Sequence, residues 1–156
     1  LTQNGVKNGR QPMNLQQVTE LLPPVVIQIA DLIGFPATER LLSAFGGTTF
    51  PIGKGLRAFG GQRAALLRDT IGDHNTKLLF QKFTGEPLYL PRCERALREL
   101  RNVRFLAEFD EANQNGTSSL MAMTLLCPKY GFSDRTGWHL LAQRKNATEH
   151  DQGALF

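Results

Sequence analysis

Two stretches of this chain have related sequences, and together they decide the fold. Residues 33–57 read IGFPATERLLSAFGGTTFPIGKGLR, and residues 71–95 read IGDHNTKLLFQKFTGEPLYLPRCER. The second stretch follows the first at a constant offset of 38 positions without a gap, with identical pairs at Ile33/Ile71, Gly34/Gly72, Thr38/Thr76, Leu41/Leu79, Phe45/Phe83 and Gly47/Gly85. Similar residues continue the match as far as Arg57/Arg95. We therefore predict an internal duplication, with copies at about residues 25–54 and 63–92.

Each copy is expected to contain a helix, a glycine stop, a second helix, another glycine stop and a short strand. Pro36 opens the second helix of the first copy, and Asp73 is expected to cap the corresponding helix of the second. One copy alone has too little apolar surface to fold. We expect the strand from Thr49 to Ile52 to pair with the strand from Pro87 to Leu90, so that the helices bury their apolar faces on a two-stranded antiparallel ribbon.

The rest of the chain is expected to be helical. One long helix is predicted from about Arg92 to Phe109, with an inward face formed by Leu97, Leu100, Val103, Leu106 and Phe109. After a break at residues 113–116, a second helix is predicted to run to about Cys127 and a third from Ser133 to about Asn146. The predicted fold class is mainly α: duplicated helix-helix-strand units with a small antiparallel ribbon (residues 14–91), followed by a carboxy-terminal helix-turn-helix (92–146). Residues 1–13 and 147–156 are polar and are expected to be disordered tails. A shorter helix is expected to start at Asn14 and to be interrupted by Pro23 and Pro24.

The helix-turn-helix prediction depends on five positions around a turn. In that motif a small residue precedes the turn glycine, an apolar residue follows it, a hydroxyl caps the second helix and an apolar residue packs back. Those places are filled by Cys127, Gly131, Phe132, Ser133 and Leu140. Two residues fit less well, because Gly137 stands where the motif packs a larger side chain and Pro128 shortens the first helix. The alternative interpretation is a plain helical hairpin.

A DNA-reading hairpin would divide its contacts between bases and phosphates. The residues expected near base edges lie at or after the cap of the third helix and are Ser133, Asp134, Arg135, Thr136, His139 and Gln143. The residues expected on phosphates are Arg92, Arg95, Lys129, Arg144 and Lys145. Trp138 is either an exposed nucleic-acid contact or a core residue.

The overall charge agrees with a polyanionic partner without requiring one. The formal net charge is +4 and the pI is near 9.4, and a basic surface attracts phosphate non-specifically. Arginines recur at every third position from Arg92 to Arg104, a spacing that spirals around a helix, so that the five cannot share one face. A solvated helix with ion pairs to neighbouring glutamates explains the same pattern.

Several other classes of protein are disfavoured. The longest charge-free stretch, from Leu21 to Ala30, is much shorter than the roughly 20 residues of a membrane span, and no secretory signal is evident, so a cytoplasmic location is expected. Cys93 and Cys127 are expected to remain thiols. A glycine-rich segment at residues 47–55 lacks the spacing and hydroxyl of a phosphate loop. Cysteine and histidine residues lack the spacing of a zinc site. We expect no catalytic activity, no bound cofactor and no metal.

Four segments carry a resemblance to a known protein family. They are Gly85-Glu86-Pro87-Leu88-Tyr89-Leu90-Pro91-Arg92, Ala96-Leu97-Arg98, Arg101-Asn102 and Lys129-Tyr130-Gly131-Phe132-Ser133-Asp134-Arg135-Thr136. The chain resembles the Mor family of phage and prophage transcription activators from Gly85 to about Lys145, and more loosely upstream. The resemblance implies a homodimer, a carboxy-terminal helix-turn-helix in the major groove of double-stranded DNA, recruitment of host RNA polymerase, and a location on the nucleoid of a bacterial cell. It also implies that Tyr89, Pro91 and Arg92 lie close to DNA and that residues 133–144 read it. This chain departs from the family in carrying two helix-helix-strand units, so the pairing that joins two subunits there can occur within one chain here.

We therefore expect a sequence-specific DNA-binding transcription regulator of the activator type. The main alternative is a helical protein-interaction or assembly module whose carboxy-terminal hairpin is purely structural.

Overall fold

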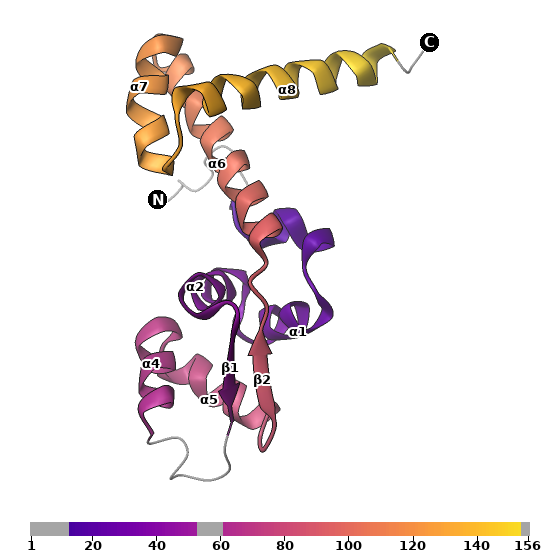
Figure 1. Cartoon of the computed structure of the whole chain (residues 1–156), viewed down its shortest axis with the longest axis vertical. Helices are drawn as coiled ribbons and strands as arrows, with labels where there is room; N and C mark the ends of the chain where they lie inside the picture. Colours follow the sequence, from indigo (N-terminus) through magenta and orange to yellow (C-terminus); the bar gives the residue numbers. More distant parts are fainter. Residues whose placement is uncertain (1–12, 53–60, 154–156) are drawn as a thin grey trace, which may run out of the picture. The chain divides into compact units, whose positions relative to one another are not determined.

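The protein is mainly helical and carries one small antiparallel sheet (Figure 1). The structure, a computed structural model, describes residues 13–52 and 61–153, with side chains as far as residue 148. It divides into two compact units, residues 1–97 and 98–156. The first holds η2 (Leu15–Leu21), α1 (Pro24–Ile33), α2 (Phe35–Phe45), β1 (Thr48–Pro51), α4 (Gln62–Ile71), α5 (Asp73–Lys82) and β2 (Pro87–Leu90). The division falls within α6 (Glu94–Gln114), which is followed by α7 (Ser119–Tyr130) and α8 (Asp134–Gly153).

The predicted order of helix, helix and strand occurs twice in the first unit. Shifted by 38 positions, the starts of α1 and α2 coincide with those of α4 and α5. The backbone repeats as well, because Gly34 has φ 88° and ψ 157° and Gly72 has φ 90° and ψ 161°. That region of φ/ψ space is open essentially only to glycine. The two glycines therefore set the same sharp corner between consecutive helices in both copies.

Each corner is secured by a buried threonine. The Thr38 hydroxyl donates to the Gly34 carbonyl at 2.8 Å, and the Thr76 hydroxyl donates to the Gly72 carbonyl at 2.8 Å. Both threonines are fully buried, a position that a hydroxyl tolerates only when it is hydrogen-bonded. The Gly34 and Gly72 carbonyls also accept the amides of Thr38 and Thr76, each at 3.1 Å. Each hydroxyl therefore adds a second hydrogen bond to the carbonyl at the helix start and is itself satisfied inside the core.

The prediction that Asp73 caps the second helix of the second copy is wrong. Gly72 occupies the cap position and makes no side-chain cap, while Asp73 is the first helical residue. The Asp73 carboxylate pairs with Lys77 one turn later, at 3.1 Å. A carboxylate in the first turn still interacts favourably with the helix dipole.

The two strands pair with each other inside one chain. The partners are Thr48 with Leu90, Thr49 with Tyr89, Phe50 with Leu88, and Pro51 with Pro87. The predicted pairing is confirmed, with β1 starting and ending one residue earlier than expected. The two prolines, Pro51 and Pro87, lie opposite one another. Because proline has no backbone N–H group, the missing hydrogen-bond donors of the sheet are confined to this one pair.

The ribbon has approximate twofold symmetry about the pair of Phe50 and Leu88. At one end the Gly47 amide donates to the Leu90 carbonyl at 2.5 Å. At the other end the Gly85 amide donates to the Ile52 carbonyl at 2.7 Å. This is the same bond in the other copy, because Gly47 corresponds to Gly85 and Ile52 to Leu90 at the 38-residue offset. The two copies thus meet as the halves of a dimer would, within a single polypeptide.

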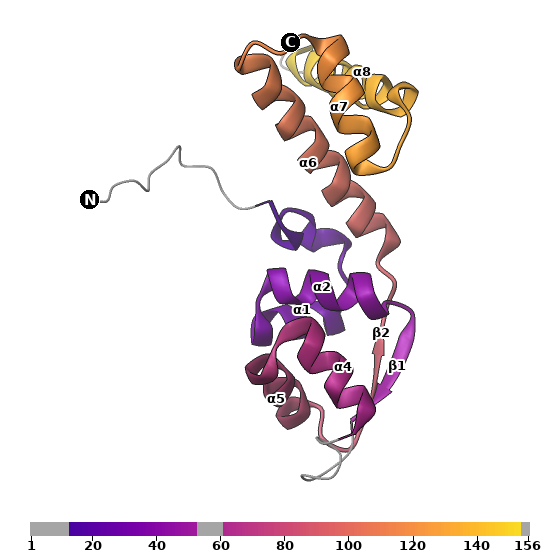
Figure 2. The same ribbon diagram turned by 90° about the vertical axis from the view of Figure 1, so that its left-hand side faces the viewer.

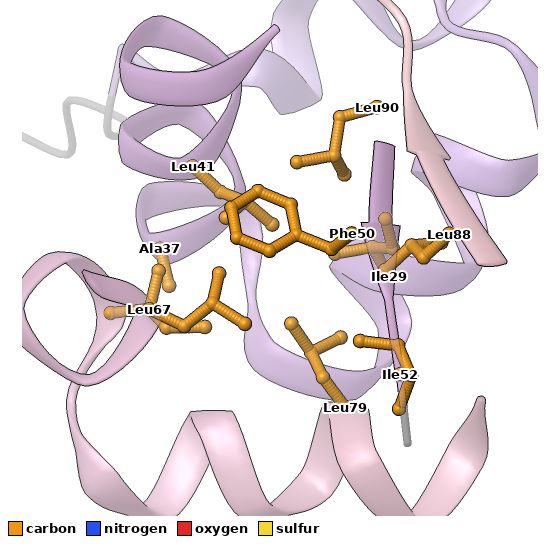
Figure 3. Packing of buried hydrophobic residues seen from close by; sticks show 10 residues of the cluster. Ile29, Ala37, Leu41, Phe50, Ile52, Leu67, Leu79, Leu88 and Leu90 are labelled. Carbon is orange, nitrogen blue, oxygen red and sulfur yellow. The ribbon is translucent and has the colours of Figure 1, made fainter. Parts of the chain in front are cut away.

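Helices α1, α2, α4 and α5 cover one face of the ribbon (Figure 2). Phe50 lies in the centre of the core between them, with Leu41, Leu67 and Leu79 pointing toward it (Figure 3). The buried members of this cluster are Ile29, Ala37, Leu41, Phe50, Ile52, Leu67, Ile71, Leu79, Leu88 and Leu90. Because both copies contribute to the same cluster, neither copy holds a complete core by itself.

The amino-terminal segment before α1 is a 3-10 helix and not an α-helix. Asn14 caps it, accepting a hydrogen bond from the Gln16 amide at 2.8 Å. Leu15 and Val18 are buried, and η2 packs against α2. The interruption expected at the two prolines is present, because α1 begins at Pro24. The disordered tail expected at residues 1–13 lies outside the described residues, except for Met13.

The helices of the second unit end later than the sequence predicted. Helix α6 runs to Gln114, and α7 includes Pro128 and reaches Tyr130. A proline in the last turn of a helix removes only one backbone hydrogen bond, so it need not end the helix. Helix α8 continues to Gly153, so the prediction of a disordered tail from residue 147 is wrong for residues 147–153. Extending an existing helix adds a hydrogen bond per residue without a new nucleation step, even where the sequence is polar.

The repeated corner gives a direct stability test. In the Gly72→Ala variant, a Cβ would meet no atom within 4 Å, so the whole effect comes from backbone strain at positive φ. We expect the free energy of unfolding to fall by about 1–3 kcal/mol, measured by urea denaturation followed by circular dichroism. The control, Ser43→Ala at an exposed site in α2, should stay within about 0.5 kcal/mol of the parent. If the Gly72→Ala protein were as stable as the parent, the positive-φ backbone conformation assigned to Gly72 would be contradicted.

Candidate nucleic-acid interface

Helix α8 begins at a tightly structured turn. Gly131 is left-handed, with φ 79° and ψ 26°, and its amide donates to the carbonyl of Pro128 at 3.2 Å. The Phe132 amide donates to the Cys127 carbonyl at 3.1 Å. Ser133 then accepts a hydrogen bond from the Thr136 amide at 3.4 Å, the arrangement expected of a helix cap. The first turn of α8 is therefore fixed by the backbone of α7.

The turn is anchored by aromatic side chains. Phe105 of α6 is fully buried and meets the Phe132 ring edge-on at 4.9 Å and the Tyr130 ring edge-on at 5.8 Å between centroids. The Arg101 guanidinium lies 4.8 Å from the centroid of the Phe132 ring. Such aromatic pairs and cation–π contacts stabilise a packed arrangement beyond the area that they bury.

The predicted inward face of the long helix is only partly right. Leu100 and Phe109 are buried, but Leu97, Val103 and Leu106 are half-buried. The central position belongs to Phe105, which the sequence analysis did not single out. The arginines spiral as expected: Arg92, Arg95 and Arg98 are exposed, whereas Arg101 and Arg104 are half-buried.

Gly137 is the point of closest approach between α8 and its neighbours. A Cβ at this position would lie 2.7 Å from Sδ of Met123, 2.9 Å from Sγ of Cys127 and 3.1 Å from Cζ of Phe105. Two of these distances are shorter than any contact that a side chain can normally make. The helix-turn-helix motif packs a larger side chain where Gly137 stands, but here the glycine lets α8 pack directly on α7 and α6.

This packing predicts a reversal of the usual effect of alanine. At an open helical site Gly→Ala stabilises a protein by about 1 kcal/mol, whereas Gly137→Ala should destabilise it by about 1–3 kcal/mol through overpacking. Urea denaturation shows whether Gly137→Ala raises or lowers the free energy of unfolding. Because Cys127→Ala removes one clashing sulfur, the double variant should lose less stability than the sum of the two single variants. A more stable Gly137→Ala protein would rule out the close contact.

The outward face of α8 carries most of the predicted reading residues. At about 100° per residue, Arg135 and His139 lie near its centre, and Gln143 lies toward one edge. Trp138, which is 39% exposed, lies toward the other edge with Lys145. Trp138 is therefore a surface residue and not a core residue. Asp134 is exposed, and Thr136 is half-buried beside the Ser133 cap.

Two residues of this face were missed by the sequence analysis. Ala142 and Asn146 are exposed and follow Arg135 and His139 along the same stripe. Alanine carries no hydrogen-bonding side chain that would mark a contact, and Asn146 was expected to be the last residue of the helix, whereas α8 continues to Gly153. Asparagine is one of the side chains that can bond adenine in two places.

Two of the cations predicted to bind phosphate are held by carboxylates of α6. Lys129 donates to both oxygens of Glu108, at 2.8 and 2.7 Å. Arg144 donates to both oxygens of Asp110, at 2.8 and 3.1 Å. These contacts tie α7 and α8 to α6 and partly neutralise both cations, so each would attract a phosphate less strongly than an unpaired cation at the same place. Arg135 and Lys145 are the better placed cations, since both are exposed on the outward face of α8.

Glu108 is also hydrogen-bonded by Tyr130. Burial opposes ionisation of Glu108, but hydrogen bonds from Lys129 and Tyr130 outweigh it and lower the pKa of the carboxyl below its usual range. Burial, and then the hydrogen bond and charge of Glu108, raise the pKa of Tyr130 well above its usual range. The tyrosine thus remains a donor and the glutamate an acceptor at neutral pH.

The lowered pKa of Glu108 predicts a pH dependence of stability. A carboxyl with a depressed pKa in the folded state stabilises the fold above its unfolded pKa of about 4.3, and this contribution is lost as pH falls through the folded pKa. The urea midpoint should therefore fall less steeply with acidification in Glu108→Gln than in the parent. Glu99→Gln, an exposed change on the same helix, should retain the slope of the parent. If the urea midpoint of Glu108→Gln changed with pH as steeply as that of the parent, the lowered pKa of Glu108 would be contradicted.

Tyr89, Arg92 and Arg95 belong to the first unit, so the expected DNA contacts fall into two sets, one in each unit. Tyr89 is 53% exposed on β2, opposite Thr49. Arg92 is exposed and lies over the Gly46-Gly47 corner, where a Cβ on Gly47 would meet its Cγ and Nε at 3.0 Å. It also pairs with Glu94 at 3.4 Å. Pro91 is half-buried and Arg95 is exposed.

The thiols and acidic groups are further side chains of the described residues that could react or hold a metal ion. In residues 13–52 and 61–148, no three histidine, cysteine, aspartate or glutamate side chains cluster in a way that would hold a metal ion. Burial raises the pKa of Cys93, and burial together with the charge of Asp134 raises the pKa of Cys127. Both shifts reduce the thiolate fraction on which nucleophilic reactivity depends. None of the described helices combines the length and apolar character needed to cross a membrane.

Comparison of the chain with protein-family models, with curated proteins and with solved structures found no match.

Proposed function

We propose that this protein is a sequence-specific DNA-binding transcription regulator that reads the major groove with the outward face of α8. In this proposal α7 and α8 form a helix-turn-helix, with α8 as the recognition helix. The observation that carries the proposal is the combination of a rigid, capped start of α8 with exposed Arg135 and His139 on its first two turns.

The chemistry of this face suits base edges. Arginine bonds guanine in two places, and histidine and glutamine also bond base edges in the groove. The first turn of α8 is held by the Gly131 corner and by Phe132 against Phe105. Rigid positioning favours base reading, because a loosely held side chain loses geometric discrimination.

The ion pairs modify the expected division of contacts. Because Lys129 and Arg144 are engaged by Glu108 and Asp110, we assign the principal phosphate contact of this unit to Lys145. The resemblance to Mor-family activators supports the further proposal that the protein acts as an activator and contacts host RNA polymerase.

The alternative is a protein-interaction module, and one observation favours it. Helix α7 exposes large apolar side chains, including Leu120 and Leu125, at 73% and 61%. Such residues suit a protein partner better than a phosphate backbone. A protein whose α7–α8 hairpin serves only structure should bind no duplex in a salt-dependent manner.

Binding to duplex DNA at two salt concentrations separates these functions. The full chain would be titrated with fragments from its own genomic neighbourhood and with random duplex. A regulator should prefer one fragment by about a thousandfold or more over random sequence. Equal, strongly salt-dependent binding to every fragment would mean that only the basic charge acts, and no binding at low salt would favour the protein-interaction module.

Two substitutions then separate base reading from phosphate contact. Arg135→Ala should lose about 1–3 kcal/mol of discrimination at one base pair while retaining most of the affinity for random duplex. Lys145→Ala should weaken binding to all sequences alike and reduce the salt slope by about 1. Lys82→Ala, an exposed cation of α5, is the matched control and should leave both properties unchanged. Equal losses on specific and random duplex in both α8 variants would contradict the assignment.

A further inference from the structure

Helix α7 is apolar on two opposite faces. Ala122, Met123 and Cys127 are buried against α6 and α8. On the other side, Leu120, Met121 and Leu125 are 73%, 52% and 61% exposed. Thr124 and Pro128 are exposed on the same side. Since a helix that is apolar all round is normally buried on all sides, this second face indicates a partner. We call these five exposed residues the α7 outer face.

The α7 outer face is electrically neutral. Lys129 is the single charged residue of α7, and it pairs with Glu108 at 2.7 Å. In a twofold contact the residues near the axis lie close to their own copies, so a charge at the centre of the face would repel its image. A neutral apolar face carries no such penalty and is compatible with its own image.

The size of the face also points to a particular partner. A 12-residue helix is about 18 Å long and about 10 Å wide, whereas a stable interface buries about 800 Å² on each partner. One helical face is too small to hold a partner on its own. It suits a partner that another interaction brings close, because a weak contact gains strength at high effective concentration.

A second copy of this chain meets that condition. The edges of β1 and β2 that face each other are paired within one polypeptide, so these two edges are not free to join two subunits. Each chain nevertheless carries a single α8, and a twofold DNA site presents two half-sites to two such helices. Two copies on adjacent half-sites are held together by the DNA, and α7 packs directly against α8.

We propose that the α7 outer face is a homotypic contact through which two copies of this chain bind neighbouring DNA half-sites cooperatively. The contact itself follows from the α7 surface, whereas its cooperative use on DNA rests on the proposed function. Thr124 lies at the middle of the face, and its short side chain allows two helices to cross there closely. The twofold axis of the contact is placed beside this residue.

Disulfide trapping tests the contact without DNA. In a Cys93→Ser background, the full chain with Thr124→Cys should form a disulfide-linked dimer under mild oxidation at high protein concentration. The matched control is Thr148→Cys on α8, since both native threonines are exposed and donate to the carbonyl four residues earlier, at 3.0 and 3.1 Å. Adding Leu120→Glu should abolish the dimer, while Leu66→Glu, an equivalent change at a 48% exposed leucine of α4, should not. Dimer yields equal for the two cysteine positions, or unaffected by Leu120→Glu, would overturn the proposal.

A second measurement tests the cooperative role. On a fragment with two half-sites, Leu120→Glu should reduce cooperativity by about tenfold, within the usual range of coupling between sites, and leave binding to a single half-site unchanged. Unchanged cooperativity would overturn this role. If the chain binds no DNA, the proposed function fails, while disulfide trapping still decides whether the α7 outer face joins two copies.

Discussion

Pairing of β1 with β2 inside one chain is the constraint on which the amino-terminal unit depends. Each copy of the repeat supplies two helices and one strand, and the buried cluster around Phe50 takes residues from both copies. A two-stranded ribbon without a packed helical layer is marginally stable in water. The strands therefore hold the helices in register, and the helices in turn make the strands stable.

The repeat also explains why particular small and polar residues stand where they do. Gly34 and Gly72 adopt a backbone conformation that other residues avoid, and the carbonyls at these corners accept hydrogen bonds from the buried hydroxyls of Thr38 and Thr76. In the carboxy-terminal unit Gly137 has a different purpose, because its missing side chain makes room for Met123 and Cys127. Gly34 and Gly72 are therefore required by their backbone angles, whereas Gly137 is required because the neighbouring side chains leave no room for a Cβ atom.

Features set by local pattern could be predicted from the sequence. The repeat, the strand pairing, the Gly131 turn and the Ser133 cap all follow from residue spacing and backbone preference. Features set by distant contacts could not. The ion pairs that engage Lys129 and Arg144 join residues 21 and 34 positions apart, and nothing in the spacing of the arginines indicates them. The burial of Phe105 and the true end of α8 were missed for the same reason, since periodicity alone does not decide which helical face is covered.

In the proposed account, one chain combines an approximately symmetric core with a single α8 as the reading helix. The internal twofold uses the facing edges of the two strands, and the proposed association with another copy uses the neutral apolar face of α7. The most direct test of this account is an isotope-filtered nuclear Overhauser experiment on a mixture of labelled and unlabelled chains. The account predicts contacts between Thr49 and Tyr89 within labelled chains only. Contacts between a labelled and an unlabelled chain at this pair would show that the ribbon joins two subunits, which would contradict internal pairing.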